Sequence, residues 1–130
     1  MNRIKDANIL IIAEHNMTCS LIFQLFQEKG IKPQHTSTET DALRLFKRTR
    51  FDLVIIDNML PLDSSGMISR IKGMKSDIPV LLINADDGEK GSADLHSPRA
   101  DVKVTRPLKI DTLLPLASQI ISHKKKRNKP

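Results

Sequence analysis

Short apolar runs alternate regularly along this chain with segments whose apolar residues have helical spacing. A continuous apolar run rich in β-branched residues is typical of a strand buried on both faces of a parallel sheet. Runs of this kind lie at 9–12, 53–56 and 80–83, and weaker strand candidates lie at 31–36 and 102–105. The alternation therefore predicts five strands with helices between them.

The segments between the strands place apolar residues three and four positions apart, which is the spacing of an amphipathic helix. Four predicted helices have inward faces formed by Leu21, Ile22, Leu25 and Phe26; by Ala42, Leu45 and Phe46; by Met67, Ile68, Ile71 and Met74; and by Leu113, Leu114, Ala117, Ile120 and Ile121. Residues 86–101 contain two glycines and a proline but few apolar residues. That segment is predicted to be irregular, because a helix there would bury little apolar surface.

Several residues are predicted to mark the ends of these helices. Gly30 is expected to cap the end of the first helix, and Thr38 with Asp41 resembles a capping box at the start of the second. Asp111 is expected to cap the last helix, with Pro115 in its first turn, where proline is tolerated.

Strands separated by helices predict an α/β fold, a doubly wound five-stranded parallel sheet with right-handed crossovers and helices on both faces. Pro33 interrupts the second strand, which is therefore expected near an edge of the sheet. A chain of 130 residues corresponds to one domain. We place this domain at 1–123 and interpret 124–130 as a basic tail or the start of a linker.

The net charge of +6 is concentrated at the end of the chain. Five positive charges lie in the tail, which leaves about +1 for the rest, so the pI of 9.7 describes the tail more than a binding face. Trp and Tyr are absent, which argues against a surface that stacks nucleic-acid bases. Contact with nucleic acid is expected only through this tail or through a downstream domain.

The composition also bears on the cellular compartment. The apolar run near the start, residues 9–13, is too short for a signal peptide or a membrane span. We therefore expect a cytoplasmic location and no membrane partner. The single cysteine, Cys19, excludes an intrachain disulfide and is expected to be buried as a small hydrophobic residue.

Candidate site residues gather where the predicted strands end, which is where sites lie in parallel α/β sheets. Glu14 and Asp57 are at the ends of the first and third strands, Asp86 and Asp87 lie beyond the fourth, and Arg106 follows the fifth. Carboxylates gathered there can bind a hard cation such as Mg²⁺, and one of them can accept a phosphoryl group covalently. The same acids could instead cap helices or face water, and their positions alone do not decide between these readings.

The stretch FDLVIIDNMLP at 51–61 closely resembles the third strand of response-regulator receiver domains. Residues 8–12 and 78–83 resemble the first and fourth strands of that family, and TRPL at 105–108 resembles its Lys-Pro turn. The resemblance covers about residues 6–122 and implies the flavodoxin-like receiver fold.

This resemblance implies a role for each matching residue. Asp57 would accept the phosphoryl group from a histidine kinase or a phosphotransfer protein. Glu14, Asp57 and the backbone carbonyl of Met59 would hold Mg²⁺. The implied phosphate-binding and switch residues are Asn84, Ala85 and Arg106.

The sequence departs from the family pattern at four positions. Ala13 replaces the first of two acids after the first strand, Asn84 replaces a hydroxyl residue, Arg106 replaces a lysine, and Lys103 replaces an aromatic residue. Loss of an outer-sphere carboxylate typically lowers metal affinity by roughly 10–100-fold. We therefore expect a weakened Mg²⁺ site.

Two functional hypotheses follow. The first is a phosphoacceptor receiver domain, a signalling module and not an enzyme, which acts on an output domain or partner protein and is compatible with a homodimer. The alternative is a phosphorylation-independent pseudo-receiver that acts as a binding or dimerisation module. A flavin or nucleotide enzyme is disfavoured, because the sequence contains neither Gly-x-Gly-x-x-Gly nor a Walker-type Gly-Lys-Ser/Thr.

Overall fold

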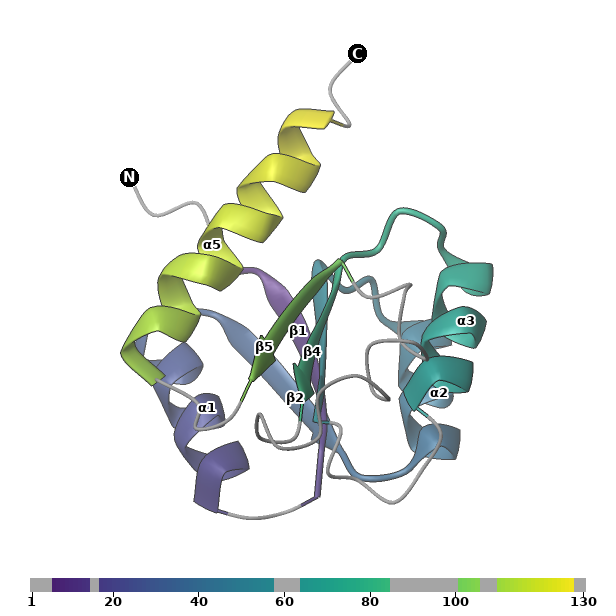
Figure 1. Cartoon of the computed structure of the whole chain (residues 1–130), viewed down its shortest axis with the longest axis horizontal. Helices are drawn as coiled ribbons and strands as arrows, with labels where there is room; N and C mark the ends of the chain where they lie inside the picture. The colour runs from purple at the N-terminus through teal and green to yellow at the C-terminus, as the bar shows by residue number, and fades with distance from the viewer. Residues whose placement is uncertain (1–5, 15–16, 58–63, 85–100, 106–109, 128–130) are drawn as a thin grey trace.

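The predicted strands form one parallel sheet in the computed structural model, which describes residues 6–14, 17–57, 64–84, 101–105 and 110–127 (Figure 1). The strands are β1 (Asn8–Ile12), β2 (Lys32–Thr36), β3 (Leu53–Asp57), β4 (Val80–Asn84) and β5 (Val102–Thr105). The helices are α1 (Met17–Glu28), α2 (Glu39–Arg48), α3 (Ser64–Met74) and α5 (Ile110–Arg127).

The strand order is β2-β1-β3-β4-β5, and every neighbouring pair is parallel. β2 lies at one edge, as predicted from Pro33, because a residue without a backbone N–H group disrupts a central strand more than an edge strand. β3 lies at the centre, and all five of its residues are buried. The predicted α/β fold is confirmed.

Helices cover both faces of the sheet (Figure 1). Buried residues of α1 and α5 pack with Ile9, Ile11, Leu53 and Ile55 on one face. Buried residues of α2 and α3 pack with the alternate strand residues on the other, namely Leu10, Ile12, Val54 and Ile56. Neighbouring residues of one strand therefore belong to opposite cores, as the two-residue period of a strand requires.

The helix ends agree with the sequence in part. Gly30 follows α1 with a φ of 83°, a conformation that glycine adopts without steric cost. The Thr38 side chain accepts a hydrogen bond from the backbone N–H of Asp41 and caps α2. The prediction for the last helix was wrong: α5 begins at Ile110, so Asp111 lies within its first turn and Pro115 lies inside the helix.

Two residues predicted to face inward are exposed. Leu21 on α1 is 45% exposed and Met74 at the end of α3 is 42% exposed, so both predictions were wrong. Ile22 and Ile68, on the same two helices, are almost fully buried. The covered stripe of each helix is thus narrower than the apolar pattern suggested.

The last helix extends into the basic tail. The backbone of α5 continues as a helix to Arg127, through the first four residues of that tail.

Within the described residues, no helix combines the length and the apolar character needed to cross a bilayer. The segment predicted to be irregular falls outside the described residues, except for Asp101.

Candidate functional site

Asp57 ends the central strand and is only 3% exposed. β1 and β4 flank it, and it lies level with Ile83 of β4. A carboxylate is costly to bury, so its presence at the end of an otherwise apolar strand points to a functional role. Parallel α/β proteins place their binding and catalytic sites at these carboxyl ends of the strands.

The Asp57 side chain lies on the face covered by α1 and α5. Leu53 and Ile55 precede it at two-residue intervals and pack in that core. Cys19 of α1 belongs to the same core. Burial raises the pKa of the Cys19 thiol, and the nearby Asp57 carboxylate raises this pKa further. The thiol therefore lies within electrostatic reach of the candidate phosphoacceptor.

Ala13 places a methyl group beside Asp57. Ile12 is level with Ile56, so the next pair along the two strands is Ala13 and Asp57. Ala13 is 3% exposed and packs in the same core as Ile11 and Cys19. The position at which the family usually has a carboxylate is thus on the Asp57 face but carries no oxygen.

The backbone of Ala13 is held by the edge strand. Its N–H group donates to the carbonyl of Thr36, and its carbonyl oxygen lies 2.7 Å from Nε2 of His35. His35 donates this bond in the tautomer that carries the proton on Nε2. These contacts from β2 position the chain that leads from β1 toward Glu14.

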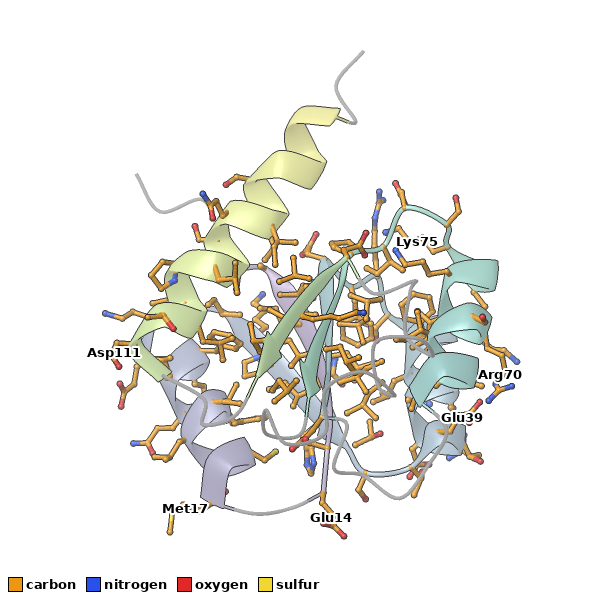
Figure 2. All side chains as sticks on the ribbon, viewed as in Figure 1. Glu14, Met17, Glu39, Arg70, Lys75 and Asp111 are labelled. Carbon is orange, nitrogen blue, oxygen red and sulfur yellow. The ribbon has the colours of Figure 1, made fainter. Side chains whose placement is uncertain are left out.

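Glu14 is exposed, and Figure 2 shows its side chain pointing away from the sheet. No cluster of three or more His, Cys, Asp or Glu side chains suited to a metal exists among the residues that the structure describes. Mg²⁺ in phosphoryl-transfer sites is usually held by one or two carboxylates, with waters and phosphate oxygens completing its shell. Asp57 is buried in the sheet whereas Glu14 is exposed and points away from it, so the structure does not bring these two predicted ligands together.

The other predicted site residues are only partly described. Asn84 is the last residue of β4, level with Thr105 of β5. Its side chain is outside the described part of the chain, as are Met59, Ala85 and Arg106. Ala85 and Arg106 directly follow these two strands in the sequence.

The sequence profile of the response regulator receiver domain matches residues 9–117. This chain belongs to the response regulator receiver family. The resemblance inferred from the third strand and the Lys-Pro turn is confirmed, and receiver domains are signalling modules of two-component systems.

Relatives of this receiver domain include two Bacillus subtilis proteins that are named as uncharacterized transcriptional regulatory proteins. YcbL is 28% identical over 98 residues, which cover 75% of this chain and 43% of YcbL. YclJ is 26% identical over 121 residues, which cover 93% of this chain and 53% of YclJ. The chain spans about half the length of these curated relatives.

Solved receiver structures share the fold at low sequence identity. A CheY-like receiver domain protein from Methanospirillum hungatei has a TM-score of 0.82 at 16% identity, with 94% of this chain and 98% of that one covered. The receiver domain of the Francisella response regulator 1452 has a TM-score of 0.78 at 22% identity, with 90% and 98% covered. These likenesses support the receiver fold.

Sequence reasoning missed two neighbours of the site. The electrostatic interaction between Cys19 and Asp57 joins a helix and a strand that are far apart in sequence. The contact between His35 and Ala13 crosses from the edge strand to the end of β1. The Cys19 neighbourhood could have been predicted in part, because the alternation along β3 places Asp57 on the same face as Leu53 and Ile55, which α1 covers.

Proposed function

We propose that this receiver domain accepts a phosphoryl group on Asp57 from a histidine kinase or a phosphotransfer protein. The observation that carries the proposal is the burial of Asp57 at the carboxyl end of the central strand. Among the described residues, Asp57 is the only charged residue in the buried set, where Thr36 is the other polar member. A carboxylate can accept a phosphoryl group covalently.

The transfer is a displacement at phosphorus. A carboxylate oxygen of Asp57 attacks the phosphorus of a phosphohistidine and forms an acyl phosphate bond. The P–N bond breaks, and its electron pair returns to the imidazole of the donor. Asp57 therefore acts as an acceptor in a stoichiometric signal, and the domain needs no catalytic residue of its own in this proposal.

Asp57, Glu14 and the backbone carbonyl of Met59 would hold Mg²⁺, which neutralises phosphoryl charge when bound. Ala13 adds no carboxylate to this set, so the proposed Mg²⁺ site is weak. Asn84, Ala85 and Arg106 would contact the phosphoryl oxygens. The Arg106 guanidinium offers a planar fork of donors to these oxygens, where a lysine would offer a compact ammonium.

The proposed output is a change in a protein-interaction surface. This surface contacts an output domain attached to the receiver or a separate partner protein in the cytoplasm. The partner can also be a second copy of the chain, which would form a homodimer. In this proposal residues 1–123 form the receiver unit, and 124–130 lead out of it. Phosphorylation switches such a surface only if the phosphoryl group favours one of two conformations.

Two observations favour the alternative of a phosphorylation-independent pseudo-receiver. Ala13 is apolar at the position beside Asp57, which weakens the chemistry that a receiver site needs. Lys103 on the edge strand β5 is half-buried and replaces the aromatic residue that the family uses as a switch. In this alternative the fold serves as a constitutive binding or dimerisation module.

Intact-mass spectrometry after incubation with acetyl phosphate and Mg²⁺ tests the proposal. The wild-type domain is expected to gain one phosphoryl group, and Asp57→Asn is expected to gain none. Asp41→Asn is the matched control, because it removes one carboxylate from an exposed position on α2. The control is expected to behave as the wild type does.

Two results would contradict the phosphoacceptor. An adduct that persists in Asp57→Asn would move the acceptor to another residue. No adduct on the wild type over a wide range of Mg²⁺ concentrations would favour the pseudo-receiver. The receiver and the pseudo-receiver share one fold, so only the phosphorylation result distinguishes them.

A further inference from the structure

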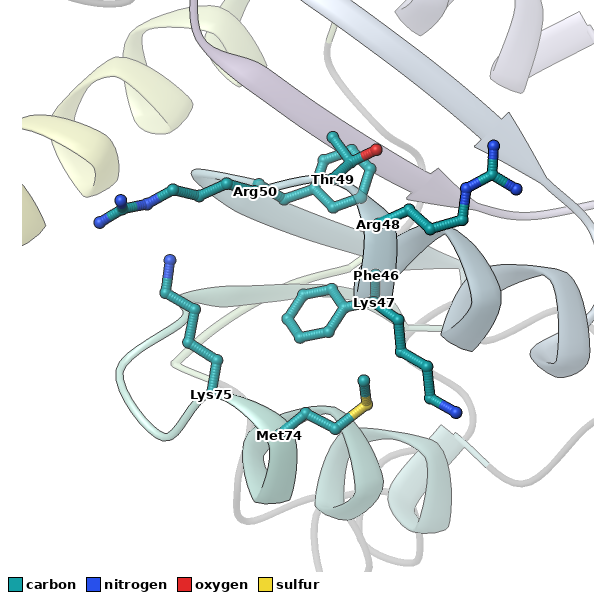
Figure 3. Close-up of a pocket in the computed structure, with 8 residues that line it drawn as sticks. Phe46, Lys47, Arg48, Thr49, Arg50, Met74 and Lys75 are labelled. Carbon is teal, nitrogen blue, oxygen red and sulfur yellow. The ribbon is translucent and has the colours of Figure 1, made fainter.

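A basic pocket lies at the end of the sheet where β3 begins, whereas Asp57 lies at the end where β3 finishes. It has a volume of about 550 Å³ and opens between the end of α2, the segment that leads into β3, and the end of α3 (Figure 3). We call it the α2–α3 pocket. Its volume lies within the range of small ligand-binding cavities, roughly 300–1,000 Å³.

The α2–α3 pocket is strongly cationic. Four of its eight lining residues are basic, Lys47, Arg48, Arg50 and Lys75, and none of the eight is acidic. Figure 3 shows Lys47 and Lys75 on opposite sides of the Phe46 ring. Lys47, Arg48 and Arg50 are exposed, so they carry the accessible positive charge at the opening, whereas Nζ of Lys75 is buried.

The favourable interaction of cations with helix C-termini explains the position of only some of these basic residues. Lys47 and Arg48 lie in the last turn of α2, where cations complement the negative end of the helix. Lys72 fills the corresponding position in the last turn of α3. Arg50 and Lys75 come after the two helices end, so they add positive charge beyond what these helix ends require.

The floor of the pocket is apolar but offers no stacking platform. Phe46 is 8% exposed and Phe51 is 1% exposed, and their rings are stacked with centroids 6.2 Å apart. Nucleobases bind to exposed aromatic faces, which these two rings lack. Met74, 42% exposed, adds an accessible apolar group at the rim.

The ends of helices also disfavour a compact phosphate here. Phosphate sites at helices use the free N–H groups of an N-terminus, whereas α2 and α3 point their C-terminal carbonyl groups toward this side. Long, separate cations around an apolar floor instead suit an extended chain with several carboxylates and an apolar side chain. An acidic protein segment has this chemistry.

We propose that the α2–α3 pocket docks an acidic segment of a partner protein. Carboxylates of the segment pair with the exposed Lys47, Arg48 and Arg50 at the opening, and an apolar side chain of the segment packs against the exposed Met74. The charge complementarity of the rim and the exposure of Met74 carry this proposal. The docking surface is separate from Asp57, because the pocket lies where β3 begins and Asp57 lies where β3 ends.

Fluorescence anisotropy with a labelled peptide of alternating glutamate and leucine tests the docking surface at low ionic strength. The whole chain is expected to bind this peptide and to bind its glutamine counterpart at least about tenfold more weakly. The double variant Lys47→Glu/Arg50→Glu is expected to weaken binding by roughly tenfold or more, since each reversal replaces attraction by repulsion. Rising salt is expected to weaken binding, because exposed charges are screened.

Lys29→Glu/Lys32→Glu is the matched control, with the same change of charge at two exposed residues outside the pocket. It is expected to change binding by roughly twofold or less, as for remote exposed charges. Both double variants should keep the circular dichroism spectrum of the wild type, because all four residues are exposed.

Several outcomes would overturn the proposal. They are no binding at low salt, equal binding of the glutamine peptide, and equal weakening by the two double variants. Tighter binding of a labelled oligothymidylate, lost in Lys47→Glu/Arg50→Glu, would assign the surface to nucleic acid and overturn the acidic-protein proposal as well.

Discussion

At the scale of single residues, the methyl group of Ala13 decides how much negative charge surrounds Asp57. Ala13 and Asp57 are neighbours at the ends of adjacent parallel strands, and both are almost fully buried. A carboxylate at position 13 would add oxygen donors for a cation but would also repel Asp57. If Asp57 binds Mg²⁺ as proposed, Ala13 lowers the affinity for Mg²⁺ and raises the stability of the metal-free domain.

Restoring this acid tests that relation. Ala13→Asp is expected to raise Mg²⁺ affinity by about 10–100-fold, which is the usual effect of an outer-shell ligand. Without Mg²⁺ the same variant is expected to lose about 1–3 kcal/mol of unfolding free energy, because a second carboxylate is buried beside the first. Titration calorimetry with Mg²⁺ and urea unfolding measure the two effects.

Ala13→Asn is the control for this experiment, because it has the same shape as the aspartate but no charge. Equal Mg²⁺ affinity in the aspartate and asparagine variants would contradict the proposal that residue 13 lies beside a carboxylate that binds Mg²⁺.

Cys19 links the core to the site through its protonation. Its pKa is raised by burial and by Asp57, so the folded state holds the thiol proton more tightly than the unfolded state. The stabilisation is fully present below the ordinary cysteine pKa, roughly 8.5, and declines as pH rises through that value toward the folded pKa. The unfolded chain ionises first, which favours unfolding at alkaline pH.

The expected result is a steeper loss of stability with pH in the wild type than in Cys19→Ala. Urea unfolding between about pH 7 and pH 10 measures both slopes, and the cysteine contributes at most about 1.4 kcal/mol per pH unit. Lysines that titrate in the same range affect both proteins alike. Parallel slopes would show that the thiol is not held in its protonated form.

At the scale of elements, one carboxylate joins the end of α3 to β4 and β5. Asp101 accepts hydrogen bonds from Nζ of Lys72 at 2.7 Å and from the N–H of Val80 at 2.8 Å. Lys72 also donates to the carbonyl of Ile78 at 2.9 Å, just before β4. Three elements are thus joined where two parallel strands begin, and the backbone of the buried Val80 is satisfied.

Asp101→Ala is expected to lower the unfolding free energy by about 1–3 kcal/mol, because it leaves the buried Val80 N–H without this acceptor. The half-exposed Asp101 side chain favours the lower part of that range. Asp41→Ala, which breaks the exposed pair with Arg44 on α2, is the control and should cost less than about 1 kcal/mol. Urea unfolding compares them, and equal losses would contradict the importance of the Val80 contact.

At the scale of the whole molecule, two hydrophobic cores share the same strands. Ile55 packs in the core under α1 and α5, and Ile56 packs in the core under α2 and α3. Loss of one core would expose every second residue of the central strands. The two cores are therefore expected to form and unfold together, as in most single domains of this size.

Phe26→Ala and Phe51→Ala test this coupling, because each removes a large buried side chain from a different core. Each is expected to lower stability by about 3–5 kcal/mol and to leave one unfolding transition. Circular dichroism in urea and amide hydrogen exchange measure the effect on each face. The milder Phe→Leu variants serve if either alanine variant is unfolded, and the survival of one core after loss of the other would contradict the expectation.

Much of this fold was predictable because burial in a parallel sheet is written into short stretches of sequence. The runs at 9–12, 53–56 and 80–83 became β1, β3 and β4 because β-branched side chains pack well on both faces of a sheet. Asp57 could be found in the same way, as the first charge after a buried run. Pro33 likewise placed β2 at an edge, since proline lacks a ladder donor.

Other features were decided only when distant segments packed together. The exposure of Leu21 and Met74 depends on how far neighbouring elements cover each helix, which periodicity does not report. The position of Ala13 beside Asp57, the link from Lys72 to Asp101 and the cationic α2–α3 pocket all join residues that are far apart in the sequence. Local apolar patterning was enough to identify the buried segments, because runs of apolar residues are the ones that folding removes from water. Which charges come together depends on the packing of distant segments, because electrostatic interactions depend on distances that are set only in the folded chain.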